Sequence, residues 1–432
     1  MSQIVANAQP TCRHCRQPLQ HTFVDLGMSP LCESLVAPDR LDAMEPYYPL
    51  HVLVCENCFL VQLREYVTPE HIFSEYAYLS SYSTSWVAHA KRYCAIIKER
   101  LGLGAESLVV ELACNDGYLL QHFGPLGVPV LGVEPAANVA KLAEEKGIPT
   151  ISAFFGTDLA QQLVLEGREA DLIVANNVLA HVPDINDFVN GIRCLLKPHG
   201  VATLEFPHIE RLIAENQFDT IYHEHFSYLS ATVVDRIARM HGLRLFDVEK
   251  LPTHGGSLRV YLAHQESLHQ TSRRVFDLIE LEDRLGLRSL RGYGSFSEKV
   301  KQAKRELLSF LIAAKKQGKR VCGYGAPGKG NTLLNYCGIG TDFLDFTVDR
   351  NPHKHGLYTP GMHIPIRPVE EIDAARPDYI LILPWNLKNE VVEQMGHVGD
   401  WGAKFVVPIP TVEVVDPQAR SAIQARPAIS VT

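Results

Sequence analysis

The stretch IYHEHFSYLS, residues 221–230, concentrates side chains that can move protons or bind a metal. It places Tyr222, His223, Glu224 and His225 in consecutive positions. In an extended segment, alternate residues face opposite sides, so Tyr222 and Glu224 would share one side while His223 and His225 share the other. A helical zinc-protease motif requires two histidines four residues apart with glutamate directly after the first, and H-E-H lacks that spacing. The stretch is therefore a candidate for proton transfer or metal binding, and its spacing alone does not separate the two.

Two C-x-x-C pairs near the N-terminus indicate a different chemistry. Cys12 and Cys15 form one pair, Cys55 and Cys58 form the other, and 39 residues separate them. Four thiolates from two tight turns complete a tetrahedral zinc site that has no open position for catalysis. Structural zinc can contribute on the order of 10 kcal/mol to the folding of such a short segment. A redox C-x-x-C pair is the alternative, because the spacer is longer than in the usual zinc ribbon. Cys32 is expected to be buried rather than to bind metal.

The composition is that of an ordinary globular chain with room for two or three domains. Of 432 residues, 46% are hydrophobic and 21% are charged, and the formal net charge is −8. Since there is no long run of lysine and arginine, a surface for nucleic acid or for anionic membrane has little electrostatic support. The N-terminal stretch has no basic start followed by an apolar core, so we expect a cytoplasmic protein. Ten cysteines in such a chain indicate free thiols or metal ligands rather than disulfides.

The elements that must position these residues follow an α/β pattern. Short apolar runs alternate with helical stretches from about residue 107, which predicts a doubly wound sheet. The predicted strands lie in 107–114, 128–135, 170–178 and 200–207, and the predicted helices lie near 118–123, 137–147 and 187–196. Two later strands, in 243–251 and 257–264, are expected to close the edge of this sheet.

A second α/β unit is predicted after a connector, 266–318, that is mostly helical. Residues 320–336 read as a strand, a glycine turn and a helix, and further strands are expected in 344–349 and 379–385. The polar and aromatic run 74–86, SEYAYLSSYSTSW, is expected to be a strand or loop edge.

The loop that follows the first predicted strand has the layout of a cofactor-binding loop. In VVELACNDGYLL, an acidic residue on the strand is followed by small and turn-forming residues and then by a helix, whose first amide groups are free donors. Glu134 ends the next strand, where a carboxylate can accept hydrogen bonds from both hydroxyls of a ribose. The loop lacks G-x-G-x-x-G, which favours S-adenosylmethionine over a dinucleotide. Because acidic residues at strand ends are common, the loop alone leaves both open.

A competing nucleotide loop lies in the second α/β unit. Gly323, Gly325 and Gly328 satisfy G-x-G-x-x-G after a strand, and Asp349 follows 21 residues later, as in dinucleotide-binding folds. An NAD-dependent oxidoreductase is therefore the alternative function. A phosphate-hydrolysing P-loop is disfavoured because glycine follows Lys329 where a magnesium-binding serine or threonine is required. The same loop could hold the diphosphate of a nucleotide-linked substrate, with Lys329 supplying positive charge.

Taken in order, the two C-x-x-C pairs, here called zinc knuckles, and seven further motifs resemble those of one enzyme family. The motifs are YAYLSSYSTSW, ELACNDGYLL, NNVLAHVPD, YHEHFSYLS, THGGSLRVY, GYGAPGKGNTLLN and DRNPHKHGLYTPGMHIPI. Over nearly the whole chain they are similar to the sugar C-methyltransferases that act at carbon 3 of nucleotide-linked 4-keto-6-deoxy sugars. The resemblance implies a small zinc-binding domain (1–72), a central class I methyltransferase domain with a Rossmann-like fold (73–285), a C-terminal Rossmann-like domain that helps to hold the nucleotide sugar (286–412) and a tail (413–432).

The resemblance also implies a chemistry for the opening stretch. A carbon next to a ketone is methylated only after its proton is removed, which requires a general base and a group that stabilises the enolate oxygen. His225 would be the base, Glu224 and Tyr222 would position it or stabilise the enolate, and Tyr76 and His181 would face it across the cleft. His223 would be a structural neighbour.

The remaining expected contacts divide between cofactor and substrate. S-adenosylmethionine would be held by Glu111, Ala113, Asn115, Gly117, Glu134, Phe154 and Asn176. Ala113 and Cys114 stand where many methyltransferases have glycine or serine. The sugar nucleotide, with thymidine diphosphate as the expected carrier, would contact Tyr78, Asn177, His254, Ser257, Tyr324 and Lys329, of which Asn177, His254 and Ser257 have a capping or strand role as the alternative. Zinc, bound by the four cysteines, would be structural, and a monomer that binds neither nucleic acid nor membrane is expected.

Overall fold

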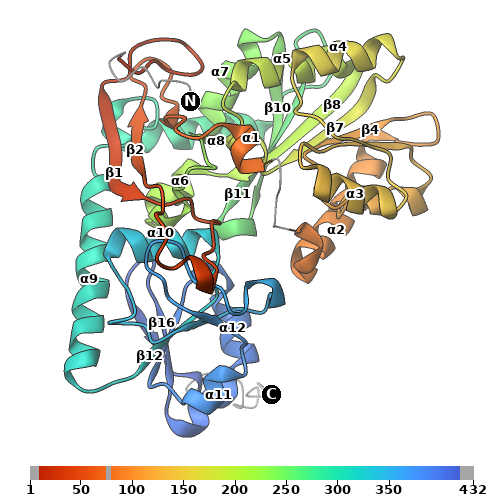
Figure 1. Cartoon of the computed structure of the whole chain (residues 1–432). Coiled ribbons are helices and arrows are strands. Elements are labelled where there is room, and N and C mark those ends of the chain that lie inside the picture. Colours follow the sequence, from red (N-terminus) through yellow and green to blue (C-terminus); the bar gives the residue numbers. More distant parts are fainter. Residues whose placement is uncertain (1–8, 74–78, 419–432) are drawn as a thin grey trace, which may run out of the picture. The chain divides into compact units, whose positions relative to one another are not determined.

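The computed structural model describes residues 9–73 and 79–418 (Figure 1). These residues divide into two compact units, each assembled from several stretches of the chain. The described part of the first unit comprises residues 9–22, 52–73, 79–210 and 224–293, and that of the second comprises 23–51, 211–223 and 294–418.

A seven-stranded sheet forms the centre of the first unit, in the order β10-β11-β8-β7-β4-β5-β6. Strands β4 to β8 are parallel to one another, and β11 and β10 complete one edge in antiparallel pairing. This confirms the predicted doubly wound sheet and its two closing strands. The strands are β4 (Val109–Leu112), β5 (Val130–Val133), β6 (Thr150–Ile151), β7 (Ala170–Asn176), β8 (Leu196–Pro207), β10 (Leu243–Leu251) and β11 (Ser257–His264).

Helices cover both faces of this sheet, because alternate residues of each strand point to opposite sides. Val110 and Ile173 pack in one hydrophobic cluster with residues of α4, α5, α7 and α8, while Val109 and Leu172 pack in another with residues of α2 and α3 (Figure 1). These helices are α2 (Thr84–Leu101), α3 (Ala137–Glu145), α4 (Thr157–Leu165), α5 (Ile185–Leu195), α7 (Ala231–Met240) and α8 (Arg273–Arg284).

Two local predictions were wrong in this unit. The run 74–86, expected to be a strand or a loop edge, enters α2 at Thr84, because the Ser83 hydroxyl accepts a hydrogen bond from the backbone N–H of Trp86 and caps that helix. The helix expected near 118–123 is only a 3₁₀ turn, Leu120–His122, and a second 3₁₀ turn, Gly124–Leu126, starts two residues after its end with Pro125 at its second position.

A four-stranded sheet, in the order β1-β2-β3-β9, includes strands from the N-terminal region and the strand that follows residues 223–225, here called the H-E-H segment. Its strands are β1 (His21–Ser29), β2 (Tyr48–Val54), β3 (Val61–Leu63) and β9 (Ser227–Tyr228). Strand β3 pairs with β9 through Val61 opposite Tyr228 and Gln62 opposite Ser227. A short helix, α1 (Pro69–Phe73), follows β3.

The second unit contains a six-stranded sheet in the order β14-β13-β12-β15-β16-β17, parallel except for the last pair. The strands are β12 (Val321–Tyr324), β13 (Thr347–Val348), β14 (Ile366–Arg367), β15 (Tyr379–Ile382), β16 (Lys404–Val407) and β17 (Glu413–Val415). Its helices are α9 (Phe296–Lys316), α10 (Gly328–Cys337), α11 (Glu371–Ala375) and α12 (Lys388–Gln394), and α6 (Ile209–Ala214) spans the boundary of the units. Strand β17 occupies the first three residues of the stretch expected to be a tail.

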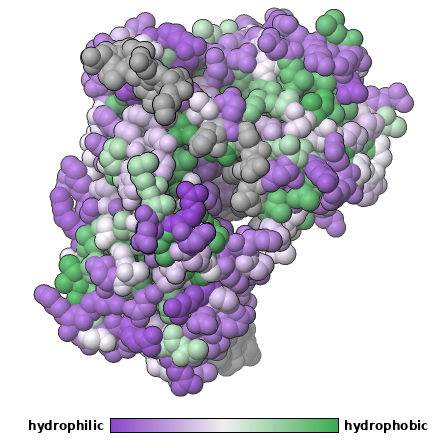
Figure 2. All heavy atoms as spheres, viewed as in Figure 1, coloured by the Kyte–Doolittle hydropathy of each residue, from purple (hydrophilic) through white to green (hydrophobic). Residues whose placement is uncertain are grey.

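The surface is typical of a globular protein. Hydrophilic residues predominate on the face drawn in Figure 2, and the hydrophobic ones occur in small separate groups. Single exposed apolar side chains such as Met44 and Leu165 are normal on such a surface. Within the described ranges, none of the helices has the length and apolar character needed to cross a membrane.

Candidate active site and zinc centre

The loop after β4 is tied to the end of β5 by Glu134. Its carboxylate accepts hydrogen bonds from the backbone N–H of Asn115 and of Ala136, each at 2.9 Å. Asn115 in turn accepts the backbone N–H of Ser80 on its side-chain oxygen, at 2.9 Å. Ala113 and Asn115 both have positive φ, 52° and 51°, so the loop follows an irregular path that these contacts hold in place. Burial raises the pKa of Glu134, and the two N–H groups oppose that shift.

Gly117 in this loop has no room for a side chain. Its φ is +75°, and a Cβ atom would lie 2.3 Å from Cδ1 of the buried Ile148. Gly127 has a similar φ of +69° but no heavy atom within 4 Å of that position. Gly127→Ala is therefore expected to cost about 1 kcal/mol from backbone strain alone. Gly117→Ala adds overpacking and should cost a further ~1–3 kcal/mol. Urea unfolding of both variants measures the difference, and equal midpoints would contradict the close packing.

Several buried polar atoms at the ends of the neighbouring strands lack a partner among the described residues. These atoms are Nδ2 and Oδ1 of Asn176 at the end of β7, Oε2 of Glu111 in β4, and Oδ1 of Asp116 in the loop after β4. Buried polar groups are normally hydrogen-bonded, so these atoms make the strand ends a candidate ligand site. Burial raises the pKa of Glu111 well above its ordinary value. Phe154, predicted to contact the cofactor, follows β6 and is 43% exposed.

Two histidines meet beside these strand ends. His181 lies in a 3₁₀ turn, Leu179–His181, after β7, and its ring centroid is 4.6 Å from that of His225 at an angle of 70°. Burial lowers the pKa of His181 to about 4, although a hydrogen bond to the backbone of Glu224 opposes the shift. His181 is therefore neutral near pH 7. The Tyr228 ring centroid lies 6.4 Å from that of His225.

Other residues of the H-E-H segment lie in different surroundings. His223 belongs to the second unit, where its Nε2 lies 3.3 Å from the carbonyl oxygen of Tyr48. Burial lowers the pKa of His223 to about 4. Tyr222 also belongs to the second unit, and Glu224 is buried in the first. Tyr76 and Tyr78, both predicted site residues, lie outside the described residues.

Asn177 and His254, predicted to contact substrate, lie together. Asn177 Nδ2 is 3.2 Å from His254 Nε2, and both residues have positive φ, 55° and 52°. The backbone N–H of Asn177 donates to the carbonyl oxygen of Glu205. Ser257, the third predicted residue, donates its hydroxyl to the carbonyl oxygen of Thr253.

A buried charged network beneath this pair was missed by the sequence analysis. The Glu205 carboxylate accepts hydrogen bonds from Arg259 at 2.6 Å and Thr253 at 2.8 Å, and it lies 3.0 Å from His89 Nε2. Burial alone would raise the pKa of Glu205, but His89 and Arg259 hold it below its ordinary value. The available signal was a charged residue inside each of two apolar strands, since buried charges are retained only when paired.

The glycine-rich loop of the second unit is closed by Asp349, whose carboxylate accepts the backbone N–H of Ala326 at 2.7 Å and that of Asn351 at 2.8 Å. Glu134 holds its loop in the same way. Gly325 has a φ of +86°, and a Cβ atom there would lie 2.6 Å from Cδ of Pro384. The turn predicted after β12 is thus confirmed.

The predicted substrate residues of this unit lie on either side of the loop. Lys329 donates to Oδ1 of Asn386 at 2.9 Å, and its ammonium lies 5.2 Å from the ring centroid of Trp385. The Tyr324 hydroxyl donates to Oε1 of Gln394 at 3.5 Å. Asp219, which the sequence analysis did not single out, accepts the indole N–H of Trp385 at 2.6 Å, and burial raises its pKa to about 6.

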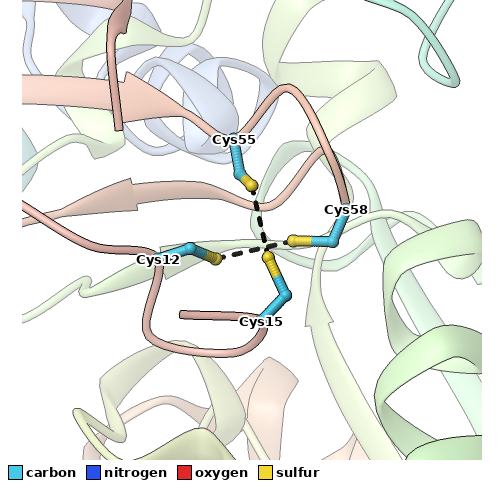
Figure 3. Close-up of side chains that lie close together, drawn as sticks. All are labelled: Cys12, Cys15, Cys55 and Cys58. Carbon is cyan, nitrogen blue, oxygen red and sulfur yellow. Dashed lines mark hydrogen bonds between the residues drawn. The ribbon is translucent and has the colours of Figure 1, made fainter. Parts of the chain in front are cut away.

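The four cysteines of the N-terminal knuckles form one cluster, with their sulfur atoms pointing toward one another (Figure 3). All four Sγ atoms lie within 4.8 Å of one another, and the pairs Cys12–Cys58 and Cys15–Cys55 are 3.5 Å apart. Tetrahedral zinc with Zn–S bonds of about 2.3 Å places its sulfur ligands about 3.8 Å apart, so the cluster fits the ion. Cys32 is buried outside the cluster, as expected.

Comparisons with known proteins identify three domains along the chain. Family models match a zinc binding domain at residues 12–73, a methyltransferase domain at 86–248 and a C-methyltransferase C-terminal domain at 252–410. The C-methyltransferase NovU of Streptomyces niveus is 35% identical over 411 residues, which cover 94% of this chain and 97% of NovU.

More distant relatives match a part of the chain. A ubiquinone biosynthesis O-methyltransferase of Bartonella tribocorum is 34% identical over 102 residues, 22% of this chain and 40% of that protein. The solved structure of magnesium protoporphyrin IX methyltransferase from Synechocystis with bound SAM is 16% identical, with a TM-score of 0.31 over 41% of this chain and 77% of that one.

The three family models follow one another along the chain, and the match to NovU spans all three. The methyl donor of the enzyme is S-adenosylmethionine, and its N-terminal region is a zinc-binding domain. The chain therefore belongs to the C-methyltransferase family.

Proposed function

We propose that the enzyme methylates carbon 3 of a nucleotide-linked 4-keto-6-deoxy sugar whose carrier is thymidine diphosphate. The observation that carries the proposal is the contact between the rings of His181 and His225. His181 lies in the turn after β7, a strand of the sheet whose β4 precedes the cofactor loop. The sugar class is supported by the resemblance of motifs such as YHEHFSYLS and THGGSLRVY to the sugar C-methyltransferases. The 35% identity to a C-methyltransferase over nearly the whole chain supports transfer to carbon.

In this proposal His225 is the general base. It removes the proton from the carbon beside the ketone, and the electron pair of the C–H bond moves to the ketone oxygen as an enolate. S-adenosylmethionine, when bound, supplies an electrophilic methyl group. His225 is 9% exposed, so the base is largely removed from bulk water.

His181 supports this step as a neutral side chain. Its ring hydrogen-bonds to the backbone of Glu224, while its Nδ1 has no partner among the described residues. The nitrogen that donates to the backbone is therefore Nε2, and Nδ1 carries a lone pair. We propose that Nδ1 accepts a hydrogen bond from a sugar hydroxyl or from the His225 ring.

The residues after β4, β5 and β7 fit the methyl donor. Asn176 has unfilled donors and acceptors, and Glu111 has an unfilled acceptor, at the strand ends where nucleosides bind in such sheets. We propose that Glu134 binds the ribose hydroxyls with its remaining lone pairs and that Phe154 contacts the adenine.

Glu134→Gln tests this assignment. The amide can accept hydrogen bonds only on one atom, so it cannot hold both backbone N–H groups and the ribose. We expect the affinity for S-adenosylhomocysteine to fall about 10- to 100-fold, equivalent to ~1.4–2.8 kcal/mol. Glu144→Gln, an exposed carboxylate on α3, is the matched control and should bind normally. Isothermal titration gives both values, and equal affinities would remove Glu134 from the cofactor site.

The glycine-rich loop of the second unit is proposed to bind the nucleotide diphosphate. Lys329, in the first turn of α10, adds a positive charge that Asn386 holds beside the Trp385 ring. Titration with S-adenosylhomocysteine, followed by thymidine diphosphate in its presence, tests the two sites together. We expect saturable binding of both and none of NADH. Binding of NADH without S-adenosylhomocysteine would favour an oxidoreductase instead.

A further inference from the structure

Arg13 lies between the first two zinc-ligand cysteines, and its backbone is fixed to the knuckle. Its N–H donates to Oε1 of Gln62 at 2.9 Å, and the Gln62 amide donates to Sγ of Cys12 at 3.2 Å. The half-buried side chain of Arg13 therefore leaves the zinc knuckle from a defined point.

The guanidinium of Arg13 contacts three different segments of the first unit. One terminal nitrogen donates to the carbonyl oxygen of Pro183 at 2.9 Å, and the other donates to the carbonyl oxygen of Leu63. The Phe226 ring faces the same group, with its centroid 5.4 Å from Cζ. Arginine suits this place because its planar fork can hold two acceptors and an aromatic face at once.

These contacts lie next to both histidines of the candidate site. Pro183 is two residues after His181, and Phe226 directly follows His225. The backbone N–H of Leu63 also donates to the carbonyl oxygen of Phe226 at 3.0 Å, so the same strand residue is bonded to Arg13 and to the His225 segment. One side chain from the zinc knuckle thus joins the two segments whose histidine rings lie 4.6 Å apart.

A second set of knuckle contacts reinforces this arrangement. Nδ1 of the buried His14 lies 2.9 Å from Oδ1 of Asn186, and the Asn186 amide donates to the carbonyl oxygen of His14 at 2.9 Å. The knuckle is therefore attached to the segment after His181 at two points. Arg13 binds Pro183, and His14 binds Asn186.

We infer that Arg13 is a positioning residue for the reaction, setting the geometry of His181 and His225 by holding the segments that carry them. The zinc knuckle then fixes the catalytic geometry as well as the fold of its own region. This inference rests on the proposed function. Since a displacement of about 1 Å in a reacting group can cost 10²-fold in rate, loss of the guanidinium should act on the chemical step rather than on ligand affinity.

The test compares Arg13→Met and Arg13→Lys with Arg16→Met. Methionine keeps the aliphatic length without donors, and lysine keeps the charge with one ammonium in place of the fork. Arg16 is on the same knuckle, but its side chain is 66% exposed, so its replacement makes the same charge change without these contacts. Zinc content, S-adenosylhomocysteine affinity, KM and kcat are measured for each. Solvent deuterium exchange at carbon 3 of dTDP-4-keto-6-deoxyglucose, with S-adenosylhomocysteine bound, reports proton removal separately.

For Arg13→Met we expect full zinc content, unchanged S-adenosylhomocysteine affinity and a KM within about threefold, with kcat and the exchange rate both about 100-fold lower. Arg13→Lys should lose about 10-fold, and Arg16→Met should match the wild type. Exchange at the wild-type rate in Arg13→Met would overturn the inference. If Arg13→Met loses zinc or fails to fold, Arg13→Lys decides in the same way. A wild-type enzyme that neither exchanges nor methylates this sugar would instead count against the proposed function.

Discussion

Replacing His225 with glutamine is expected to lower kcat by roughly 10³-fold, within the range that general base catalysis contributes. Glutamine retains hydrogen-bonding capacity but has no basic nitrogen to accept the substrate proton. Binding of S-adenosylhomocysteine should not change, because the proposed cofactor residues follow β4, β5 and β7 and lie outside the H-E-H segment. Turnover with dTDP-4-keto-6-deoxyglucose and isothermal titration measure the two effects separately.

His223→Gln is the matched control for this variant. His223 is two residues away and similarly buried, but its Nε2 is directed to the carbonyl oxygen of Tyr48, and a glutamine amide can donate to the same atom. We expect turnover within about threefold of the wild type. Equal losses in the two variants would mean that the segment acts through its fold and would remove His225 as the base.

Cys55→Ser is expected to abolish zinc binding and to destabilise the N-terminal region by an amount comparable to the net stability of a domain. Structural zinc contributes on the order of 10 kcal/mol, while a whole domain is stable by about 5–15 kcal/mol. The loss should reach the proposed active site, because β3 begins three residues after Cys58 and pairs with β9, which begins two residues after His225. The zinc content per chain, the unfolding temperature measured by calorimetry and the turnover rate should all decrease.

The half-buried Cys194 provides the control, since it lies outside the cysteine cluster. Cys194→Ser should retain one zinc per chain, the wild-type unfolding temperature and full turnover. If Cys55→Ser also retained zinc and unfolded at the wild-type temperature, the four cysteines would not form a structural metal site.

The parts of the molecule that could be predicted from the sequence are those set by local patterns. The zinc cluster follows from two tight turns that each present two thiolates, and the sheet of the first unit follows from short apolar runs that alternate with helices. The loops after β4 and β12 were located because small and turn-forming residues directly follow an apolar strand run.

The parts that could not be predicted depend on contacts between distant residues. Arg13 and Pro183 are 170 residues apart in sequence, and Asp219 and Trp385 are 166 apart. Arg259 and Glu205 pair across neighbouring strands 54 residues apart. No periodicity records which distant partner a buried charge will meet, so only the fold identifies these pairs. The polar run that became the cap and first turn of α2 was also misread, because serine and threonine suit a helix start as well as a loop.

The most direct test of the proposed function follows a labelled methyl group. The enzyme is incubated with S-adenosylmethionine carrying a ¹³C-methyl group and with dTDP-4-keto-6-deoxyglucose, and the product is examined by NMR and mass spectrometry. We expect the sugar to gain the mass of one ¹³CH2 group, with the labelled carbon coupled to carbon 3 and with no proton left on carbon 3. A labelled methyl group bonded to oxygen, or a sugar left unlabelled by an enzyme that binds both ligands, would contradict C-methylation of this substrate.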